Sequence, residues 1–569
     1  MSRLRTRWRA APQVDQDSVQ ALGAQLGVPD GVARMLLLRG FSEAASAKQF
    51  LRPRLDQLHD ARMMTSLDAA VIRLARAVRD GELIMIHGDY DVDGICSSTL
   101  LTRALRGLGG NAFPFIPHRL TDGYDLGAAG VNKAIESGAR VVVTCDCGTS
   151  AVTPVADLNA AGIDVVISDH HLPRGELPVA LALLNPRRDG CAYPDKDLAA
   201  VGVAFKLALA LAAALGANDA FIWKMLDLVA LATVADVAPL RGENRVFVRY
   251  GLRMIAESEN IGLRALLRAS GMDGKPLTAG KLGFTLGPRL NAAGRLGHAL
   301  RGVELLMTES REEANVIARE LEELNQRRQS LDRTTLDEAR SMAERLPQDD
   351  TFGVVLGKQG WHPGVVGIVA SRIVEEFGRP AILVALDGDT GKGSGRSISA
   401  FDLHSALGLC SDLLQRYGGH RAAAGVTIGS TNMGAFAARF NDVARERLTR
   451  DDLFPELRID VELELDHATL ELETILRHFE PFGVGNPAPL FVARNVTAAA
   501  APRVVGRDGL KLRLAGASGA EIDAIGWGMA EMASRILPGA PLDVAFRLER
   551  DEYQGESRLQ AKLADIVVR

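Results

Sequence analysis

Three aspartates stand at alternate positions directly after a run of apolar residues in LIMIHGDYDVDG, residues 83–94. They are Asp89, Asp91 and Asp93, and Gly94 follows them. Carboxylates that are crowded together repel one another, and each resists ionisation beside the next. Because the preceding residues predict a buried strand, we expect a positively charged partner for these acids.

The pattern D-x-D-x-D-G also begins a calcium-binding EF-hand loop. Such a loop requires a glutamate at its twelfth position, and Leu100 stands there in this chain. A predicted strand precedes the aspartates, whereas a helix precedes an EF-hand loop. We therefore reject the EF-hand interpretation.

Further acids and imidazoles follow two other apolar runs. Asp146 comes directly after VVVTC, and Asp169, His170 and His171 come directly after VVIS. A last acid, Asp236, lies in the otherwise apolar stretch ALATVADVAPL. A single buried aspartate there would cost several kcal/mol unless it were paired or bound to a metal.

The elements that must position these residues alternate between strands and helices. We expect strands at 83–88, 111–119, 139–148 and 163–171, with helices at 95–108, at 126–138 and from about 149 to 162. Apolar runs without alternation predict a parallel sheet that is covered on both faces. Sites in such sheets form beyond the carboxyl ends of the strands, so the acids should converge on one edge.

Mixed carboxylate and imidazole ligands suit Mn²⁺, and Mg²⁺ fits where oxygens dominate. The carboxylates outnumber the needs of one divalent ion. Two ions about 3.5–4 Å apart, bridged by a shared aspartate, would absorb the charge and could activate a water for attack at phosphorus. His87 stands four residues before Asp91 and is a further candidate ligand, while Asp89 is a candidate for a supporting role.

The remainder of the chain divides into three parts. Helix-rich sequence runs from 198 to about 345, and 309–346 contains no Gly or Pro, which predicts one or two long connecting helices. A second α/β unit follows from about 351 to 450. Strict alternation in 458–466, 510–514 and 544–549 predicts a small antiparallel sheet or barrel.

Several residues carry groups suited to holding a phosphate backbone. Arginine can bind a phosphate with two hydrogen bonds, and Ser394-Gly395-Arg396-Ser397 is interpreted as a short nest of exposed backbone N–H groups. The candidates are Arg119, Arg289, Arg295, His362, Arg372, Ser394, Arg396 and His420. Aromatic residues that could stack on bases are Phe482, Phe491, Trp527 and Tyr553, and the sequence favours none of them.

The composition limits the class of protein. Of the 569 residues, 47% are hydrophobic and 24% charged, and the net charge of −5 excludes a wholesale basic coat. The five cysteines are too few and too irregular for a disulfide framework or a zinc ribbon, so we expect buried thiols. The Arg-rich N-terminus lacks an apolar h-region, and no apolar stretch is long enough to span a membrane. We therefore expect a cytoplasmic protein without a membrane partner.

At Asp169-His170-His171 the sequence resembles the DHH superfamily of metal-dependent phosphoesterases. The ordered motifs GDYDVDG, PHRLTDGYDLG, TCDCG, SDHH, VADVAPLRGENR and PRLNAAGR are similar to those of the RecJ family of single-stranded-DNA-specific exonucleases. GWHPGVVGIVASRI, GSGRS and GGHRAAAG resemble the associated DHHA1 domain, and PFGVGNPAPLF and DEYQGESRLQ resemble its OB-fold. One departure is TDGYDLG, where family members often carry EGYG.

The resemblance implies a fold, an activity and a set of roles. The fold is an α/β parallel-sheet DHH lobe and a smaller α/β DHHA1 lobe joined by a long helix, with a C-terminal OB-type barrel. The implied activity is 5′→3′ hydrolysis of single-stranded DNA with two Mn²⁺ or Mg²⁺ ions in repair and recombination. The implied metal ligands are Asp91, Asp93, Asp146, His170 and Asp236. Asp146 would be the bridge, and His171 would face the scissile phosphate.

The resemblance and the composition together predict five parts and two partners. The parts are an N-terminal helical segment (1–80), a DHH catalytic domain (81–308), a connecting helix (309–348), a DHHA1 domain (349–450) and an OB-fold nucleic-acid-binding domain (455–569). A single-strand-binding protein and a RecQ-type helicase are partners by family resemblance.

Three rival functions are weaker. A DHH phosphodiesterase for short oligonucleotides or cyclic dinucleotides would not need 455–569. A non-catalytic replication accessory protein would have lost ligands, yet every expected acid and both histidines stand here. A pyrophosphatase would not need the barrel either.

Overall fold

The structure is a computed structural model that describes residues 6–119, 121–173, 175–553 and 556–569. The described residues form two compact units. The parallel-sheet unit comprises Glu43–Asn325 and Leu476–Ala488. The composite unit comprises the described residues of Met1–Ser42, Gln326–Ile475 and Pro489–Arg569.

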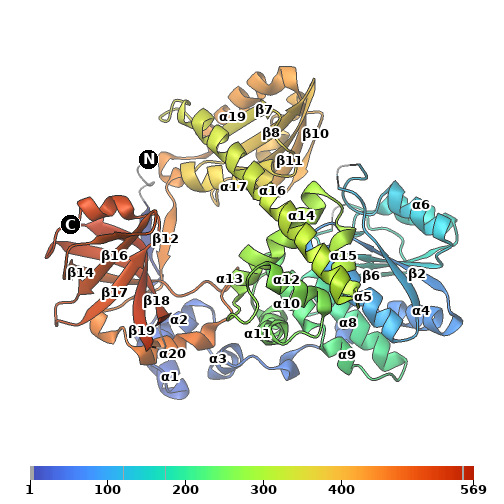
Figure 1. The fold of residues 1–569 in the computed structure, drawn as a ribbon, viewed down its shortest axis with the longest axis horizontal. Coiled ribbons are helices and arrows are strands. Elements are labelled where there is room, and N and C mark those ends of the chain that lie inside the picture. Colours follow the sequence, from blue (N-terminus) through green and yellow to red (C-terminus); the bar gives the residue numbers. More distant parts are fainter. Residues whose placement is uncertain (1–5, 120, 174, 554–555) are drawn as a thin grey trace. The chain divides into compact units, whose positions relative to one another are not determined.

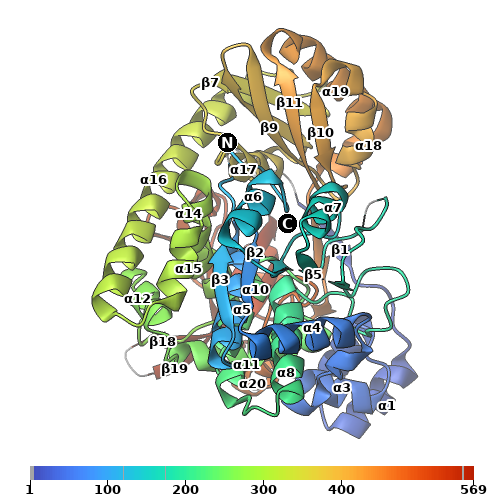
Figure 2. The same ribbon diagram turned by 90° about the vertical axis from the view of Figure 1, so that its right-hand side faces the viewer.

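A five-stranded parallel sheet forms the centre of the parallel-sheet unit, with the strand order β3-β2-β4-β5-β6. Its strands are β2 (Leu83–Gly88), β3 (Asn111–Phe115), β4 (Val141–Cys145), β5 (Asp164–Ser168) and β6 (Ala182–Leu184). Figure 2 shows β2 and β3 side by side. The sequence predicted the first four strands, and β6 is an addition because three apolar residues are too short a run to stand out.

Both faces of this sheet are buried, as the apolar runs predicted. Ile84 and Ile86 pack with α4 (Leu67–Asp80), α5 (Val92–Gly107) and α8 (Ala200–Ala214) on one face. Met85 and Val142 pack on the other face with α6 and α7. The bounds of these two helices are Ala128–Ser137 and Val152–Ala160. Alternate residues of a strand point to opposite faces, so one strand serves both layers.

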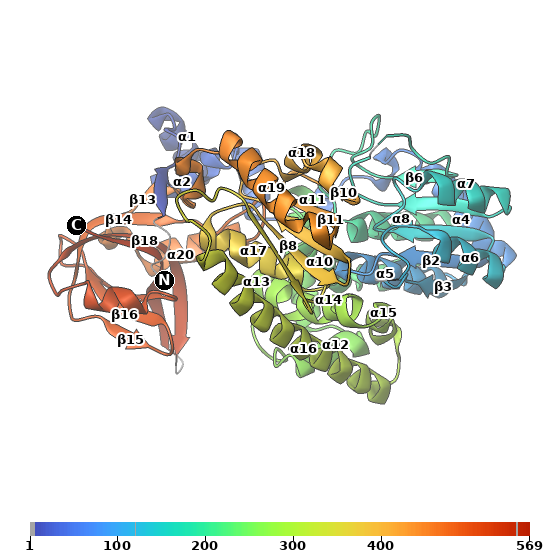
Figure 3. The same ribbon diagram turned by 90° about the horizontal axis from the view of Figure 1, so that it is seen from above.

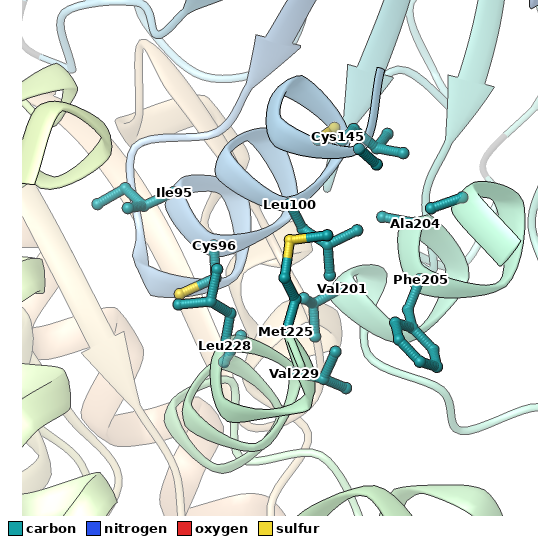
Figure 4. Packing of buried hydrophobic residues seen from close by; sticks show 14 of the residues in the cluster. Ile95, Cys96, Leu100, Cys145, Val201, Ala204, Phe205, Met225, Leu228 and Val229 are labelled. Carbon is teal, nitrogen blue, oxygen red and sulfur yellow. The ribbon is translucent and has the colours of Figure 1, made fainter. Parts of the chain in front are cut away.

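Further helices of this unit extend the layer that contains α5 and α8. They are α9 (Ala220–Trp223), α10 (Leu226–Ala235), α11 (Gly242–Ala256), α12 (Ile261–Ala269), α13 (Ala279–Lys281), the π-helical turn η3 (Leu282–Leu286), α14 (Gly287–Leu296) and α15 (Leu300–Met307). The helix α3 (Ala44–Leu51) also belongs to this unit. Figure 4 shows Leu100, Val201, Phe205 and Met225 meeting in the apolar core of this layer.

The helix α16 (Arg311–Glu344) confirms the predicted long connecting helix, and it begins in one unit and ends in the other. It leads into a five-stranded sheet of order β10-β11-β9-β8-β7 (Figure 1). The strands are β7 (Val354–Gln359), β8 (Ala381–Asp387), β9 (Thr390–Arg396), β10 (Arg416–Gly419) and β11 (Ala423–Gly429). The C-terminal half of α16 and α17 (Val366–Phe377) cover one face, while α18 (Leu403–Gly408) and α19 (Met433–Arg447) cover the other.

The last part of the chain forms a seven-stranded sheet of order β13-β14-β18-β19-β17-β16-β15, and an additional β14–β16 pairing closes it (Figure 3). Its strands are β13 (Val461–Glu462), β14 (Phe491–Ala498), β15 (Arg503–Val505), β16 (Gly509–Ala515), β17 (Glu521–Gly526), β18 (Pro541–Tyr553) and β19 (Glu556–Val568). The helix α20 (Leu470–Leu476) precedes the main strands. The predicted fold class of two α/β lobes, a long helix and a C-terminal barrel is confirmed.

Two details of the barrel differ from the sequence prediction. The alternating run 458–466 is not one strand, because β12 (Glu456–Ile459) pairs with β1 (Arg7–Ala10) in a separate ribbon and only β13 joins the barrel. The β13–β14 and β17–β19 pairs are parallel, so the sheet is mixed. The helices α1 (Gln16–Leu26) and α2 (Asp30–Leu38) complete the N-terminal part.

The described helices include none that is long and apolar enough to cross a bilayer. All five cysteines are buried and unbonded to one another, which confirms the prediction of buried thiols.

The core of the parallel-sheet unit yields a stability prediction. The buried ring of Phe205 contacts Trp223 and Phe247 edge to face at centroid distances of 5.3 and 5.6 Å. Phe205→Ala should lower the free energy of unfolding by about 3–5 kcal/mol, because it removes these contacts and leaves a cavity. The measurement is the first unfolding transition in urea. Phe284→Ala is the control, since its side chain is 89% exposed and should change stability by less than about 0.5 kcal/mol.

Candidate metal centre

The hydrogen-bond ladder of the parallel sheet continues past the ends of its strands and aligns the predicted site residues. The backbone N–H of Asp89 donates to Cys145 O over 3.1 Å, that of Asp146 to Ser168 O over 3.0 Å, and that of Asp169 to Leu184 O over 3.0 Å. The residues that follow β2, β4 and β5 therefore stand in register at one edge. This is the convergence that the strand-end pattern predicted.

Three groups of side chains at this edge could each hold a metal ion, with ligand atoms within 4.8 Å of one another. The groups are Asp89–Asp91–Asp146, Asp146–His170–His171 and Asp93–His170–Asp236. Asp146 and His170 each belong to two groups, so the groups form one continuous centre. The sequence-predicted ligands Asp91, Asp93, Asp146, His170 and Asp236 are thus brought together from four separate parts of the chain.

Two buried atoms, Nε2 of His170 and Oδ1 of Asp146, face each other without a hydrogen-bond partner among the described residues. The Nδ1 of His170 lies 3.1 Å from Leu198 O, and a carbonyl only accepts, so Nδ1 carries the proton of the neutral ring. Its Nε2 lone pair therefore points at Asp146 Oδ1, 3.2 Å away, and both buried atoms lack a partner among the described residues. Two opposed lone pairs repel, and a cation between them would remove the repulsion. The donor set therefore fits a divalent metal.

Asp91 and Asp93 lie at the N-terminus of α5, which begins at Val92 and not at the predicted residue 95. Asp91 caps the helix, with Oδ1 accepting from the N–H groups of Asp93 and Gly94. Asp93 accepts from the backbone N–H groups of Ala200 and Val201, each over 2.8 Å. Helix N-termini carry a partial positive charge, so they stabilise carboxylates that must remain ionised to bind metal.

Asp169 orients the two histidines that follow it. Its Oδ1 accepts from the backbone N–H groups of both histidines and lies 2.8 Å from Nδ1 of His171. Its Oδ2 accepts from the N–H of Thr149 over 2.9 Å. Burial alone would raise the pKa of Asp169, but the hydrogen bond from His171 holds it well below its usual range. Asp169 is therefore an ionised residue that positions His171 rather than a metal ligand.

Burial and mutual repulsion dominate the electrostatics of the acids. Burial and then the charge of Asp91 raise the pKa of Asp89 and Asp146 well above the usual value, and they raise that of Asp93 to about 7. Burial and then Asp93 raise the pKa of Asp236 in the same way. Without a cation, the centre therefore holds protons near neutral pH.

The pKa values of the two histidines are shifted in opposite directions. Burial lowers the pKa of His170 to about 4, so its ring is neutral and able to bind a metal. Burial also opposes the charge of His171, but the hydrogen bond to Asp169 outweighs it and the pKa rises to about 9. The His171 side chain is 41% exposed and is a hydrogen-bond donor at neutral pH.

The geometry does not favour His87 as a ligand. It points to the face of the sheet that α6 covers, where a Cβ on Gly130 would lie 2.7 Å from its Nε2. Its Nδ1 lies 3.5 Å from Cys147 Sγ, and His87 belongs to none of the three groups of described residues. Alternate side chains of a strand point to the same face of the sheet, so His87 points to the same face as Met85. It therefore points away from the acids at the sheet edge.

Close backbone approaches explain two glycines of the site. A Cβ on Gly94 would lie 2.3 Å from Asp89 O, so only glycine lets α5 begin directly against the strand end. A Cβ on Gly294 would lie 2.3 Å from Tyr90 O, so α14 packs on the same loop. Asp146 itself has φ +65°, a conformation that costs a non-glycine residue energy and persists where the surroundings determine it.

Sequence reasoning missed three supporting residues. The buried Asn185, after β6, donates to His171 O over 2.7 Å and to Thr149 Oγ1 over 3.0 Å. Asp125 Oδ1 accepts from the N–H of Gly148 over 2.7 Å, so the TDGYDLG loop holds the turn after Asp146. Tyr124 Oη lies 3.2 Å from Nε2 of His171. Asn185 could have been found as a polar residue after a short apolar run, and Tyr124 by its place in a motif.

Two of the three predicted phosphate-binding residues of the parallel-sheet unit, Arg119 and Arg295, lie near Tyr90, in the loop that carries Asp89 and Asp91. The Arg119 guanidinium lies 4.7 Å from the ring centroid of Tyr90. Arg289 is engaged by Glu322 and by Thr285 O, both at 2.5 Å. Arg295 lies in the last turn of α14, one residue after Gly294.

The predicted phosphate-binding residues of the composite unit lie around β9, α17 and the turn after β10. Arg396 Nη1 donates to Ser394 Oγ over 3.0 Å, and a Cβ on Gly367 would lie 2.8 Å from that hydroxyl oxygen. Arg372 pairs with Asp332 at 3.1 Å. His362 accepts from the N–H of Gly364, and His420 donates its N–H to Ala423 O.

The interpretation of residues 394–397 as a loop nest is wrong. Ser394, Gly395 and Arg396 belong to β9, which pairs with β8 and β11, so their backbone groups lie in a sheet ladder. Gly395 is a glycine because a Cβ there would lie 2.9 Å from Leu403 Cδ2 and 3.1 Å from Ile382 Cγ1. A glycine in the sequence does not by itself distinguish such a crowded strand from a loop.

The candidate stacking aromatics differ in exposure. Phe491 is buried against Phe546, Phe482 is half-buried, and Trp527 is 53% exposed on the barrel. The side chain of Tyr553 lies outside the described part of the chain.

Comparisons with known proteins match this architecture. The model of the DHH family N-terminal domain matches residues 83–233, that of the DHHA1 domain matches 350–446, and that of the RecJ OB domain matches 459–565. The parallel sheet with its acid and imidazole edge and the second α/β lobe thus define a DHH protein with a DHHA1 domain.

Named relatives show to which family of DHH proteins this chain belongs. The chain is 36% identical to the single-stranded-DNA-specific exonuclease RecJ of Escherichia coli over 97% of both chains. It is 36% identical to RecJ of Bacillus subtilis over 97% of this chain and 70% of that protein. The structure of RecJ from Thermus thermophilus with Mn²⁺ superimposes with a TM-score of 0.85 at 33% identity, covering 99% of this chain and 80% of that one. The structure of the same protein with Mg²⁺ superimposes with a TM-score of 0.79. This chain belongs to the RecJ family.

The raised pKa values predict that metal binding releases protons. A cation must displace protons from acids such as Asp93, whose pKa is about 7 in the metal-free chain, so Mn²⁺ affinity should rise with pH. We expect up to about tenfold per pH unit for each proton released, between about pH 6 and 8. The measurement is isothermal titration calorimetry in two buffers of different ionisation enthalpy. Equal heats in both buffers and a pH-independent affinity would contradict it.

The same shifts fix the sign of the stability change. An acid whose pKa is higher in the folded chain than its ordinary value of 3.8 binds more protons when folded. The stability of the metal-free chain should therefore fall as the pH rises from about 4 towards 7.

Proposed function

We propose that this chain is a metal-dependent exonuclease that hydrolyses single-stranded DNA from the 5′ end, in DNA repair and recombination. The observation that carries the proposal is the sharing of Asp146 and His170 between the three ligand groups. A shared aspartate is what a pair of neighbouring ions requires. The supporting context is membership of the RecJ family, whose curated members carry the name single-stranded-DNA-specific exonuclease.

The cofactors in this proposal are two Mn²⁺ or Mg²⁺ ions. They would supply an activated water and neutralise charge on the phosphodiester. The residues that would hold the ions are Asp91, Asp93, Asp146, His170 and Asp236, with Asp146 as the proposed bridge and Asp89 as a further acid of the same centre. Relatives support this choice, since RecJ of Thermus thermophilus has been crystallised with each of these ions.

His171 is the residue that we propose to contact the scissile phosphate. Its Nδ1 is held by Asp169, so Nε2 points away from the sheet edge next to the hydroxyl of Tyr124. A protonated imidazole can donate a charge-assisted hydrogen bond to a phosphoryl oxygen. This bond would strengthen as negative charge develops on that oxygen.

We propose that basic and polar residues of both units hold the DNA backbone. Ser394 and Arg396 form the best-defined pair, because their side chains are already hydrogen-bonded to each other and lie beside Gly367. The remaining candidates are Arg119, Arg289, Arg295, His362, Arg372 and His420. Arg289 and Arg372 already pair with Glu322 and Asp332, so DNA would compete with these acids.

The barrel would hold the strand beyond the reacting end, since OB-folds bind single strands in basic grooves with stacked bases. Trp527 is the described aromatic candidate with the greatest exposure. The domain boundaries and the partners expected from the sequence, a single-strand-binding protein and a RecQ-type helicase, remain proposals.

Removing the central carboxylate tests the mechanism. Asp146→Asn keeps the side-chain shape but removes the charge shared by two groups, so hydrolysis should fall by about 10²–10³-fold or more. Binding of single-stranded DNA should persist, and the metal-free fold should keep its stability because the repulsion at the site falls. The measurements are oligonucleotide cleavage with Mn²⁺ and fluorescence anisotropy. Asp273→Asn, at an exposed aspartate, is the matched control, and cleavage retained by Asp146→Asn would exclude Asp146 from the mechanism.

Polarity and strand choice need their own experiment. Single strands and duplexes labelled at the 5′ or the 3′ end should be digested with Mn²⁺ and separately with Mg²⁺. We expect immediate release of short labelled products from 5′-labelled single strands, late release from 3′-labelled ones, and little digestion of duplexes. Immediate release of the 3′ label would overturn the proposed direction. Preference for di- and trinucleotides over long strands would favour an oligonucleotide phosphodiesterase.

A further inference from the structure

The segment Leu476–Ala488, which we name the brace, lies in one unit while its chain neighbours lie in the other. It begins at the last residue of α20 and precedes β14. The rest of α20 and all of β14 belong to the composite unit, whereas the brace packs within the parallel-sheet unit. The family match to the RecJ OB domain spans 459–565 and so includes it. The motifs PFGVGNP, in the brace, and RGENR, residues 241–245, have no role in the mechanism above.

Arg245 of α11 anchors the start of the brace. Its guanidinium donates to His478 O, Phe479 O and Glu480 O over 2.8–2.9 Å, and its Nε donates to Phe50 O over 2.9 Å. The side chain is buried and lies 4.0 Å from the ring centroid of Phe50. Because a guanidinium is planar and its donors have fixed directions, hydrogen bonds from it to several carbonyls hold the brace in one orientation.

The tip of the brace contacts the loop that follows the candidate ligand Asp236. Gly483 and Asn486 exchange backbone hydrogen bonds of 2.9 and 3.1 Å, which closes the tip. The N–H of Leu240 donates to Val484 O over 2.7 Å, and Arg241 Nε donates to Gly485 O over 2.6 Å. A Cβ on Gly483 would lie 2.7 Å from Leu240 Cδ1, so this contact has no spare room.

The loop held in this way is strained beside the metal centre. Asp236 is the C-cap of α10, and its Oδ2 lies 3.8 Å from Nε2 of His170. The next residue, Val237, has φ +61°, which is costly for a β-branched side chain. Such a conformation persists where neighbouring contacts determine it. The contacts of the brace with residues 240 and 241 supply such a constraint.

Asn244 connects the loop after Asp236 with the segment that positions the candidate ligands His170 and Asp93. Its buried side chain donates to Pro239 O over 3.1 Å and to Asp197 O over 2.6 Å. The residue after Asp197 is Leu198, whose carbonyl orients His170, and the N–H groups of residues 200 and 201 hold Asp93. One amide thus joins the loop after Asp236 to the segment that positions two further candidate ligands.

We propose that the brace and the RGENR motif position the metal ligands, with Arg245 and Asn244 as positioning residues that touch neither metal nor DNA. The inference rests on the metal centre of the proposed function, and it does not depend on the identity of the substrate.

The test moves the brace without changing any charge. Gly483→Ala forces its new methyl group against Leu240, and Mn²⁺ binding to the full-length metal-free chain should weaken by about tenfold, the scale at which supporting residues act on metal sites. Free Mn²⁺ is read by electron paramagnetic resonance. Gly434→Ala is the matched control, because a Cβ there meets no atom within 4 Å, and its affinity should equal that of the unaltered chain.

Two further variants separate positioning from folding. Leu240→Val removes the clashing Cδ1, so adding it to Gly483→Ala should bring the affinity back to within about threefold of the original. Arg241→Met, at an exposed side chain, removes the hydrogen bond to Gly485 O and should weaken Mn²⁺ binding by about threefold. Thermal unfolding in EDTA reports whether each variant is folded.

The outcomes are distinguishable from those of the proposed function. Folded Gly483→Ala and Arg241→Met chains that bind Mn²⁺ as tightly as the control would overturn the inference. A chain in which the variants lose Mn²⁺ affinity as expected, but whose unaltered form binds Mn²⁺ without cleaving labelled single strands, would support the inference and refute the exonuclease.

Discussion

The crowding of buried carboxylates at one edge of a parallel sheet is the constraint around which the rest of this structure is organised. Asp89, Asp93, Asp146 and Asp236 each have a pKa raised by burial first and by a neighbouring acid next. Such an arrangement destabilises the metal-free fold and becomes favourable when divalent cations supply the missing charge. The unpartnered Nε2 of His170 belongs to the same arrangement.

Backbone dipoles stabilise two of the acids of this centre. Asp91 lies at the N-terminus of α5, and Asp93 accepts from the first N–H groups of α8. Neutral donors favour the ionised carboxylate without competing with a cation for the site, whereas a fixed positive side chain would repel the metal. Asp169 has a different role, because its hydrogen bond with His171 favours the protonated form of that ring.

Support for the centre also comes from distant parts of the chain. The brace is about 240 residues from the loop that it contacts, and Arg245 alone reaches three successive carbonyls of it. The strained φ of Val237 and the buried amide of Asn244 lie on the route between this support and the ligands. The OB barrel is attached to the rest of the chain through this segment, so in the proposed arrangement it is covalently continuous with the support of the candidate metal centre.

The sequence by itself determined the fold class, the kind of chemistry and most of the acids, because apolar runs that end in Asp or His encode both a parallel sheet and its functional edge. Tertiary structure alone decided three other things. It decided which face of the sheet His87 points to, that residues 394–396 lie in a strand, and that the brace packs against the loop that follows Asp236. The physical reason is that a short stretch of sequence is enough to show a strand and the polar residues that follow it. The face to which a side chain points and the packing of distant segments depend on contacts between residues that lie far apart in the sequence.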